Sequence, residues 1–127
     1  MSFEKRLKGS SQRTAQLTIT NTVANLADSD SVAVSVPAEV RGFEIYNPNN
    51  FSVWLKIFNG AASSITLSSA VPSEVYELKQ GAVNYRPVNH PITYMASRMS
   101  FAVTREPGAG ATSPVQSVVG KIIYGLG

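Results

Sequence analysis

The chain has 127 residues, which is enough for one domain with a single hydrophobic core and too few for two domains of ordinary size. Hydrophobic residues make up 43% of it and charged residues 15%, which excludes an intrinsically disordered chain. The absence of cysteine excludes a disulfide scaffold, thiolate catalysis and cysteine-ligated metal. So low a charge favours a surface that is partly covered by neighbouring subunits.

The formal net charge of +3 lies entirely in the first thirteen residues, where four basic residues face the single acid Glu4. In the rest of the chain seven basic residues balance seven acidic ones. A short cationic segment attracts an acidic partner without altering the fold behind it. We therefore expect residues 1–13 to form an extended binding arm ahead of one domain over residues 14–127. The partner-binding residues predicted in the arm are Lys5, Arg6, Lys8 and Arg13.

Alternation of apolar and polar residues predicts β-strands, and no convincing amphipathic helix appears. Residues 14–20 place Ala15, Leu17 and Ile19 on one face, and residues 31–36 repeat the pattern with three valines. Nowhere do about 18 apolar residues occur together, and no signal-peptide core follows the charged start. The sequence therefore predicts neither a membrane span nor secretion by a cleaved signal.

The clearest pattern spans residues 40–60, which we expect to form a β-hairpin. Two runs with alternating apolar residues flank the turn-forming sequence NPNN at residues 47–50. The opposite face of the second run carries Trp54 and Phe58. That face is too apolar to be left in water, so we expect something to cover both side chains.

Further strands are expected over residues 64–68, 74–79, 91–96, 100–105 and 117–124. A helix ending at Gly81 is the alternative for residues 74–79, but Tyr76 and Leu78 alternate with charged residues, which favours the strand. Eight or nine short strands separated by Pro, Gly and Asn turns predict an all-β fold, an antiparallel β-sandwich of jelly-roll type. The apolar last strand must pair within the sheet or with a neighbour.

The search for reactive groups finds no catalytic constellation. His90 is the only histidine, it lies in a turn, and no GxSxG sequence occurs. Asp28 and Asp30 resemble the start of a calcium loop, but the glycine and glutamate that complete such a loop are absent. The glycines of residues 107–114 lack the lysine and helix of a phosphate-binding loop. We expect no enzyme, no metal site and no cofactor.

The aromatic residues leave three functions open. Trp54 and the five tyrosines would suit a carbohydrate-binding module, or a single-stranded nucleic-acid binder. Filling a core or a subunit interface is favoured, because Tyr and Trp are enriched there. A net charge of +3 is modest for phosphate binding, so an acidic protein surface is preferred to nucleic acid. The predicted subunit-interface residues are Trp54, Phe58, Val118, Ile122 and Tyr124.

Residues 41–60, RGFEIYNPNNFSVWLKIFNG, resemble hairpins in small all-β virion proteins of tailed bacteriophages. In these, a strand ends in an asparagine-rich turn and the next reads aromatic, aliphatic, lysine, aliphatic, aromatic, Asn. Residues 81–105, GAVNYRPVNHPITYMASRMSFAVTR, are similar to the closing part of such proteins. The resemblance leaves out the arm. It implies a capsid decoration (cement) protein, or a related head or tail protein, that is multimeric and has no enzymatic activity.

Together these observations predict a virion structural protein that binds the capsid shell through its arm and contacts sister subunits through an apolar face. The expected partners are the major capsid protein or other virion proteins, and further copies of the chain, with a trimer favoured. The expected location is the virion, assembled in the host cytoplasm. A carbohydrate- or receptor-binding module of a tail complex is the alternative, and a single-stranded nucleic-acid binder is the third.

Overall fold

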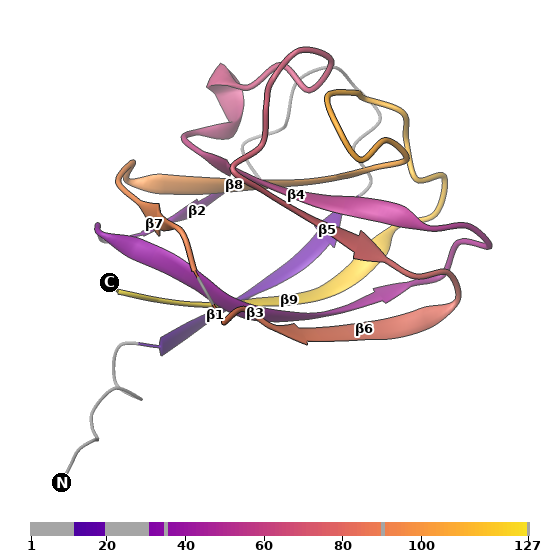
Figure 1. Ribbon diagram of the computed structural model, residues 1–127, viewed down its shortest axis with the longest axis horizontal. Coiled ribbons are helices and arrows are strands. Elements are labelled where there is room, and N and C mark those ends of the chain that lie inside the picture. The colour runs from indigo at the N-terminus through magenta and orange to yellow at the C-terminus, as the bar shows by residue number, and fades with distance from the viewer. Residues whose placement is uncertain (1–11, 20–30, 35, 90, 127) are drawn as a thin grey trace, which may run out of the picture.

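The computed structural model of the chain describes residues 12–19, 31–34, 36–89 and 91–126. These residues form nine strands and one short 3-10 helix, and the strands make two antiparallel sheets packed face to face (Figure 1). The predicted all-β sandwich is confirmed. The elements are β1 Gln12–Ile19, β2 Ser31–Ala33, β3 Ala38–Asn47, β4 Val53–Asn59, η3 Ala62–Ser64, β5 Glu74–Leu78, β6 Ala82–Pro87, β7 Thr93–Tyr94, β8 Arg98–Thr104 and β9 Val118–Leu126.

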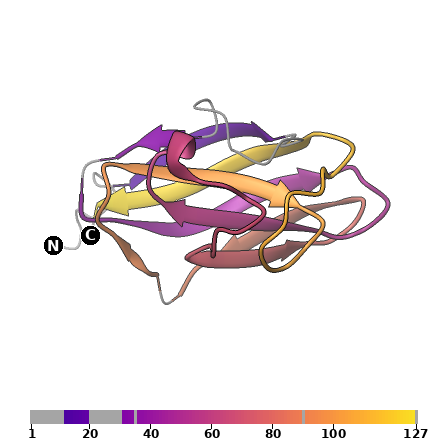
Figure 2. The same ribbon diagram turned by 90° about the horizontal axis from the view of Figure 1, so that it is seen from above.

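The five-stranded sheet has the order β1-β9-β3-β6, with β7 pairing with the start of β3. The four-stranded sheet has the order β2-β8-β4-β5. Seen from above, the strands of both sheets run along the long axis of the molecule (Figure 2). Chain neighbours therefore often lie in different sheets: β5 and β6 are separated by a short turn, yet each is the edge strand of its own sheet.

The prediction of a β-hairpin over residues 40–60 is wrong. β3 pairs with β6, β7 and β9, whereas β4 pairs with β5 and β8, so the two strands lie in opposite sheets. Phe43 and Ile45 on β3 and Leu55 on β4 all point into the space between the sheets and are buried. A hairpin with one apolar face gives the same alternation as two strands that face each other across a core, which is why the pattern misled.

Two buried asparagines hold this connection between the sheets. The Asn47 amide nitrogen donates hydrogen bonds to the carbonyl oxygens of Phe51 (3.0 Å) and Leu78 (2.9 Å). Its side-chain oxygen accepts from the backbone and the side-chain nitrogen of Asn49, each at 2.9 Å. Asn49 in turn exchanges two hydrogen bonds with the backbone of Gln116. The asparagine-rich segment is therefore a polar link between sheets rather than a hairpin turn.

One other strand prediction fails, one strand was not predicted, and the remaining predictions hold with shifted ends. Residues 64–68 form no strand, because η3 and a turn closed by hydrogen bonds to the Thr66 carbonyl occupy this region. β6 was not predicted, although Val83 and Tyr85 alternate there with Asn84 and Arg86. The strands expected at 74–79, 100–105 and 117–124 are β5, β8 and β9. The strand expected over residues 91–96 shrinks to the two residues of β7.

The main hydrophobic core fills the space between the sheets, and each large side chain fully buried there contributes about 1.5–3 kcal/mol. It contains aromatic and aliphatic residues from both sheets. Its buried members are Val40, Phe43, Ile45, Val53, Leu55, Ile57, Leu78, Tyr94, Met99, Phe101, Val103, Val118, Ile122 and Tyr124.

A second, smaller core covers the outer face of the four-stranded sheet. Phe58 on β4 and Ala102 on β8 pack under Ala62, Ile65 and Leu67, which belong to the loop of residues 60–73. The loop of residues 105–117 lies over the same sheet (Figure 1), and the Gly110 amide donates to the Leu67 carbonyl, so the two loops are joined. The expectation that Phe58 would be covered is confirmed, and the cover is part of this chain.

Candidate binding surfaces

The outer face of the five-stranded sheet carries exposed aromatic and aliphatic side chains. The strand register sets Val119 on β9, Tyr46 on β3 and Val83 on β6 in one row across the sheet. Their exposed fractions are 46%, 45% and 61%. Monomeric proteins expose single apolar residues commonly, but a row of three on adjacent strands is a contiguous apolar strip.

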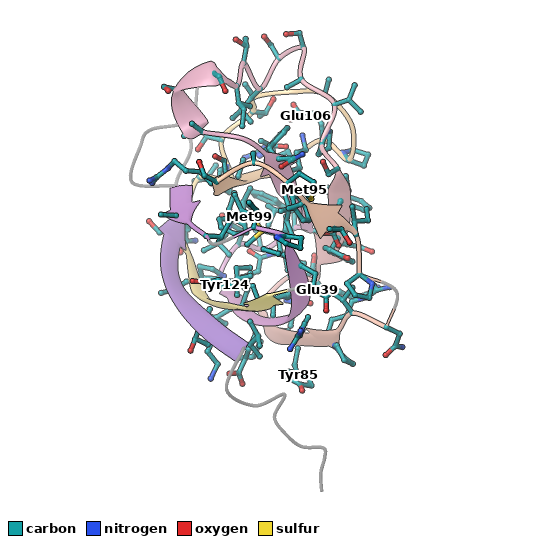
Figure 3. The ribbon with its side chains drawn as sticks, turned by 90° about the vertical axis from the view of Figure 1, so that its left-hand side faces the viewer. Glu39, Tyr85, Met95, Met99, Glu106 and Tyr124 are labelled. Carbon is teal, nitrogen blue, oxygen red and sulfur yellow. The ribbon has the colours of Figure 1, made fainter. Side chains whose placement is uncertain are left out.

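The neighbouring row on the same face consists of Lys121 on β9, Glu44 on β3 and Tyr85 on β6. Lys121 and Glu44 form an ion pair of 3.6 Å between Nζ and Oε1. Tyr85 is 66% exposed and points away from the sandwich (Figure 3). We call the surface made by these two rows, residues 44, 46, 83, 85, 119 and 121, the open face.

The two outer faces of the sandwich thus differ. The one on the four-stranded sheet lies under the loops of residues 60–73 and 105–117, and even Lys56 on it is fully buried. The Lys56 ammonium lies 3.5 Å from the Gly110 carbonyl oxygen. Burial lowers the pKa of Lys56, and the negative charge of Glu106 opposes that shift. Only the open face presents a wide sheet surface, among the residues that the structure describes.

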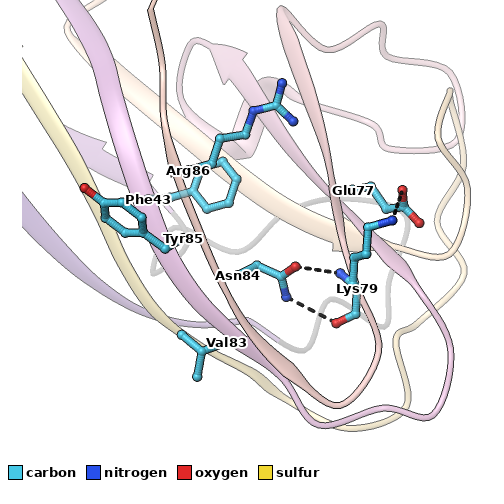
Figure 4. Close-up of a pocket in the computed structure, with 7 residues that line it drawn as sticks. All are labelled: Phe43, Glu77, Lys79, Val83, Asn84, Tyr85 and Arg86. Atoms are coloured by element: carbon cyan, nitrogen blue, oxygen red, sulfur yellow. Dashed lines mark hydrogen bonds and ion pairs between the residues drawn. The ribbon is translucent and has the colours of Figure 1, made fainter.

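A cleft of about 440 Å³ lies at one side of the sandwich, between the edge strands β5 and β6 (Figure 4). Asn84 closes its floor: the amide of Lys79 donates to the Asn84 side-chain oxygen (2.8 Å), and the Asn84 nitrogen donates to the Lys79 carbonyl (3.2 Å). Arg86 lines it and also lies over the ring of Tyr76, 5.2 Å from the ring centre. The lining is mixed in charge, because Glu77 lies 3.7 Å from the Lys79 ammonium.

Beside this cleft, the buried carboxylate of Glu74 joins the two sheets. It accepts hydrogen bonds from the hydroxyl of Tyr94 on β7 (2.5 Å) and from the hydroxyl of Tyr76. Burial, with these hydrogen bonds second, raises the pKa of both tyrosines above the ordinary value. Phenols held protonated in this way are poor proton donors or acceptors at neutral pH.

Within the described residues no group of three His, Asp or Glu side chains is placed to hold a metal ion. The same residues include no helix long and apolar enough to cross a membrane. His90, Asp28 and Asp30, considered above as candidate ligands, lie outside the described residues.

The arm residues Lys5, Arg6 and Lys8 also lie outside the described residues. The backbone of Arg13 belongs to β1, where it pairs with Tyr124 of β9. The first strand therefore begins at Gln12, two residues before the predicted domain start.

The predicted subunit interface needs correction for four of its five residues. Val118, Ile122 and Tyr124 point into the main core, and Phe58 lies in the second core. Because the chain covers these side chains itself, they offer no surface to a neighbouring subunit. Trp54 is half-buried on the outer side of β4.

The open-face residues were not predicted as contact residues, because the residues predicted on β9 lie on its inward face. Val119 and Lys121 alternate with the core residues Val118 and Ile122, and the last strand is apolar at both parities. The available signal was that Val119 follows Val118, and that Tyr46 follows Ile45, so that each strand carries an apolar residue on its second face. A strand apolar on both faces is buried or bound on both.

The sequence matches no protein-family model, and no curated protein matches it. A comparison with solved structures finds only distant likenesses. Tobacco streak virus coat protein is 9% identical, with a TM-score of 0.35, over 98% of this chain and 90% of that one. A chain of infectious bursal disease virus, Gx strain, is 15% identical, with a TM-score of 0.39, over 91% of this chain and 32% of that one. PirA is 10% identical, with a TM-score of 0.36, over 98% of both chains. Likenesses this distant assign no family.

Proposed function

We propose that this chain is a structural protein of a virion, and more narrowly a capsid decoration protein of a tailed phage. The observation that carries the proposal is the open face: an apolar and aromatic strip on a rigid sandwich is suited to permanent packing against other proteins. The sandwich behind the arm is neutral, so its own contacts depend on shape and apolar area rather than on strong charge.

Two further features support a role in assembly rather than in catalysis. The buried ionisable groups Glu74 and Lys56 are engaged in contacts within the fold, where they tie strands and loops together. The net positive charge of the chain is confined to its first thirteen residues, which contain Lys5, Arg6, Lys8 and Arg13. We infer that this arm binds an acidic patch on the capsid shell, while the sandwich contacts further copies of the chain.

The test is co-sedimentation with capsid shells of the same virus that lack this chain. The informative variant changes Lys5, Arg6 and Lys8 together to Gln, which keeps the arm's length and leaves β1 intact. We expect this variant to lose at least about tenfold in affinity, and binding of the unaltered chain to weaken as salt rises. The matched control changes the exposed residues Lys79, Arg86 and Arg105 to Gln and should bind nearly normally. Undiminished binding by the arm variant would refute the role of the arm.

The cleft between β5 and β6 supports a second candidate, a carbohydrate- or receptor-binding module. Asn84 and Arg86 bring an amide and a guanidinium to the cleft, and Tyr85 also lines it although its ring points toward the open face (Figure 4); an aromatic ring, an amide and a guanidinium are groups that bind sugars in shallow sites. Glycan binding that competes with free sugar and disappears in Tyr85→Ala would favour this function. Binding to single-stranded nucleic acid that falls steeply with salt would favour the third.

A further inference from the structure

We propose that the open face is a homodimer interface, in which two copies stack sheet against sheet about a two-fold axis that runs parallel to the strands between β3 and β9. This inference deepens the self-association part of the function proposed above and names the surface that carries it. It does not depend on the arm or on the shell.

The strand register determines which residues meet in such a pair. A two-fold axis lying in the interface and parallel to the strands exchanges left and right across the sheet but keeps each row at its own level. With the axis between β3 and β9, Val119 therefore meets Tyr46 of the second copy, and Tyr46 meets the second copy's Val119. Val119 and Tyr46 are thus the apolar residues that meet across the axis, whereas Val83 on β6 lies over β1 of the second copy.

The charged row is self-complementary under the same operation. Lys121 of one copy lies opposite Glu44 of the second copy, and the reciprocal pair forms on the other side of the axis. The two residues are already paired within each chain at 3.6 Å, with side chains 39% and 47% exposed, so their charges stand at the surface. Stacking converts two isolated ion pairs into a four-membered alternating cluster.

The open face bears one acid and one base, so its net charge is zero. A strongly charged partner, such as nucleic acid or an acidic shell surface, would gain little from this arrangement. A second copy of the same face matches it charge for charge, because like-charge contacts are avoided and opposite charges coincide. Charge complementarity therefore selects the second copy as the occupant.

Sedimentation equilibrium of the full chain over a wide concentration range tests the pairing. The unaltered chain should be dimeric, and Tyr46→Ser should raise the dissociation constant about tenfold or more, since it removes the centre of the apolar strip. The control Val71→Ser removes an 86% exposed side chain from the loop of residues 60–73, on the opposite side of the molecule, and should leave the dimer unchanged. Circular dichroism verifies that each variant is folded.

A charge exchange distinguishes contacts between chains from contacts within one. Glu44→Lys and Lys121→Glu should each be monomeric, because each faces a like charge both within its chain and across the axis. An equimolar mixture of the two variants should form a heterodimer, because every contact across the axis then joins opposite charges. A purely intramolecular role of the Glu44–Lys121 pair predicts no rescue on mixing.

A chain that is monomeric at every concentration, a trimer, or a dimer indifferent to Tyr46→Ser and Glu44→Lys would each overturn the pairing. Shell binding is read separately: Glu44→Lys retains the whole arm and should still sediment with capsid shells. Loss of dimerisation with shell binding preserved would support both proposals. A stable dimer that ignores shells would support the pairing and refute the shell-binding function.

Discussion

Replacing Asn47 by Ala should destabilise the fold far more than its size suggests, because this buried residue links the two sheets. Its side chain makes four hydrogen bonds, two as donor to the Phe51 and Leu78 carbonyls and two as acceptor from Asn49. Leu78 ends β5 in the four-stranded sheet, whereas Asn47 ends β3 in the five-stranded sheet. Alanine leaves all four partners without this side chain.

The expected loss in the free energy of unfolding follows from the cost of leaving buried hydrogen-bonding groups without partners. Each net hydrogen bond is worth about 1 kcal/mol, and a buried polar group left without a partner costs about 1–3 kcal/mol. The hydrogen bonds of Asn47 to Leu78 and Asn49 are buried. We therefore expect Asn47→Ala to lower the free energy of unfolding by about 3–5 kcal/mol. For a domain of this size that lowers Tm by roughly 10–20 °C.

The assay is urea unfolding followed by the fluorescence of Trp54, which is the only tryptophan and lies on β4 beside the affected connection. The matched control is Asn50→Ala, which changes the same residue type three positions on at an exposed site and should cost less than about 0.5 kcal/mol. If Asn47→Ala stays within about 0.5 kcal/mol of the unaltered chain, the asparagines do not hold the sheets together, and the account of this connection given above is refuted.

Three further predictions concern the two cores. Phe58→Ala should cost about 3–5 kcal/mol in urea unfolding, because it empties the second core under the loop of residues 60–73; a loss below about 1 kcal/mol would mean that this loop contributes little. Burial, and then the hydrogen bond to Glu74, raises the pKa of Tyr94, so the folded state keeps a proton that the unfolded state loses above about pH 10. Stability should therefore be constant below that pH and fall above it by up to about 1.4 kcal/mol per pH unit, and Tyr94→Phe should flatten the fall when unfolding is compared at pH 9 and 11. Lys56→Met should stay within about 1 kcal/mol of the unaltered chain, or exceed it, in thermal unfolding at pH 7, because it removes a buried ammonium but keeps the packing; Lys56→Ala, which leaves a cavity, should be clearly less stable.

Local alternation was enough to predict most of the strands, but not which strands pair. Phe43 and Ile45 on β3 and Leu55 and Ile57 on β4 were correctly expected on apolar faces, and all four are buried in one core. Pairing depends on where the chain turns, and a segment rich in asparagine can either reverse a strand or carry it to the opposite sheet. The hydrogen bond from Asn47, at the end of β3, to the carbonyl of Leu78, at the end of β5, favours the second course, and its partner lies 31 residues away in the sequence.

The candidate surface was less predictable than the fold for a related reason. β9 has apolar residues on both of its faces, for example Val118 on one and Val119 on the other. The sequence of such a strand does not show which face points outward. The sequence favoured Val118, Ile122 and Tyr124 for subunit contacts, but the inward side of β9 is fixed by Val118 and Ile122 packing against the opposite sheet. In β6, Val83 and Tyr85 alternate with Asn84 and Arg86 in a way typical of an exposed edge, and only the register shows that this strand extends the open face.

The loop of residues 105–117 lies on the opposite side of the sandwich from the open face, and this arrangement has a practical use. Glu106 holds the base of its tip by accepting hydrogen bonds from the Thr112 backbone and hydroxyl, while Gly108 at the tip is exposed with open space around it. The loop lies on the side of the four-stranded sheet, opposite β3 and β6 of the five-stranded sheet (Figure 1). A peptide inserted after Gly108 would therefore point away from the molecule while the open face stays in contact with a second copy. This position is therefore a natural site for an epitope or an affinity tag.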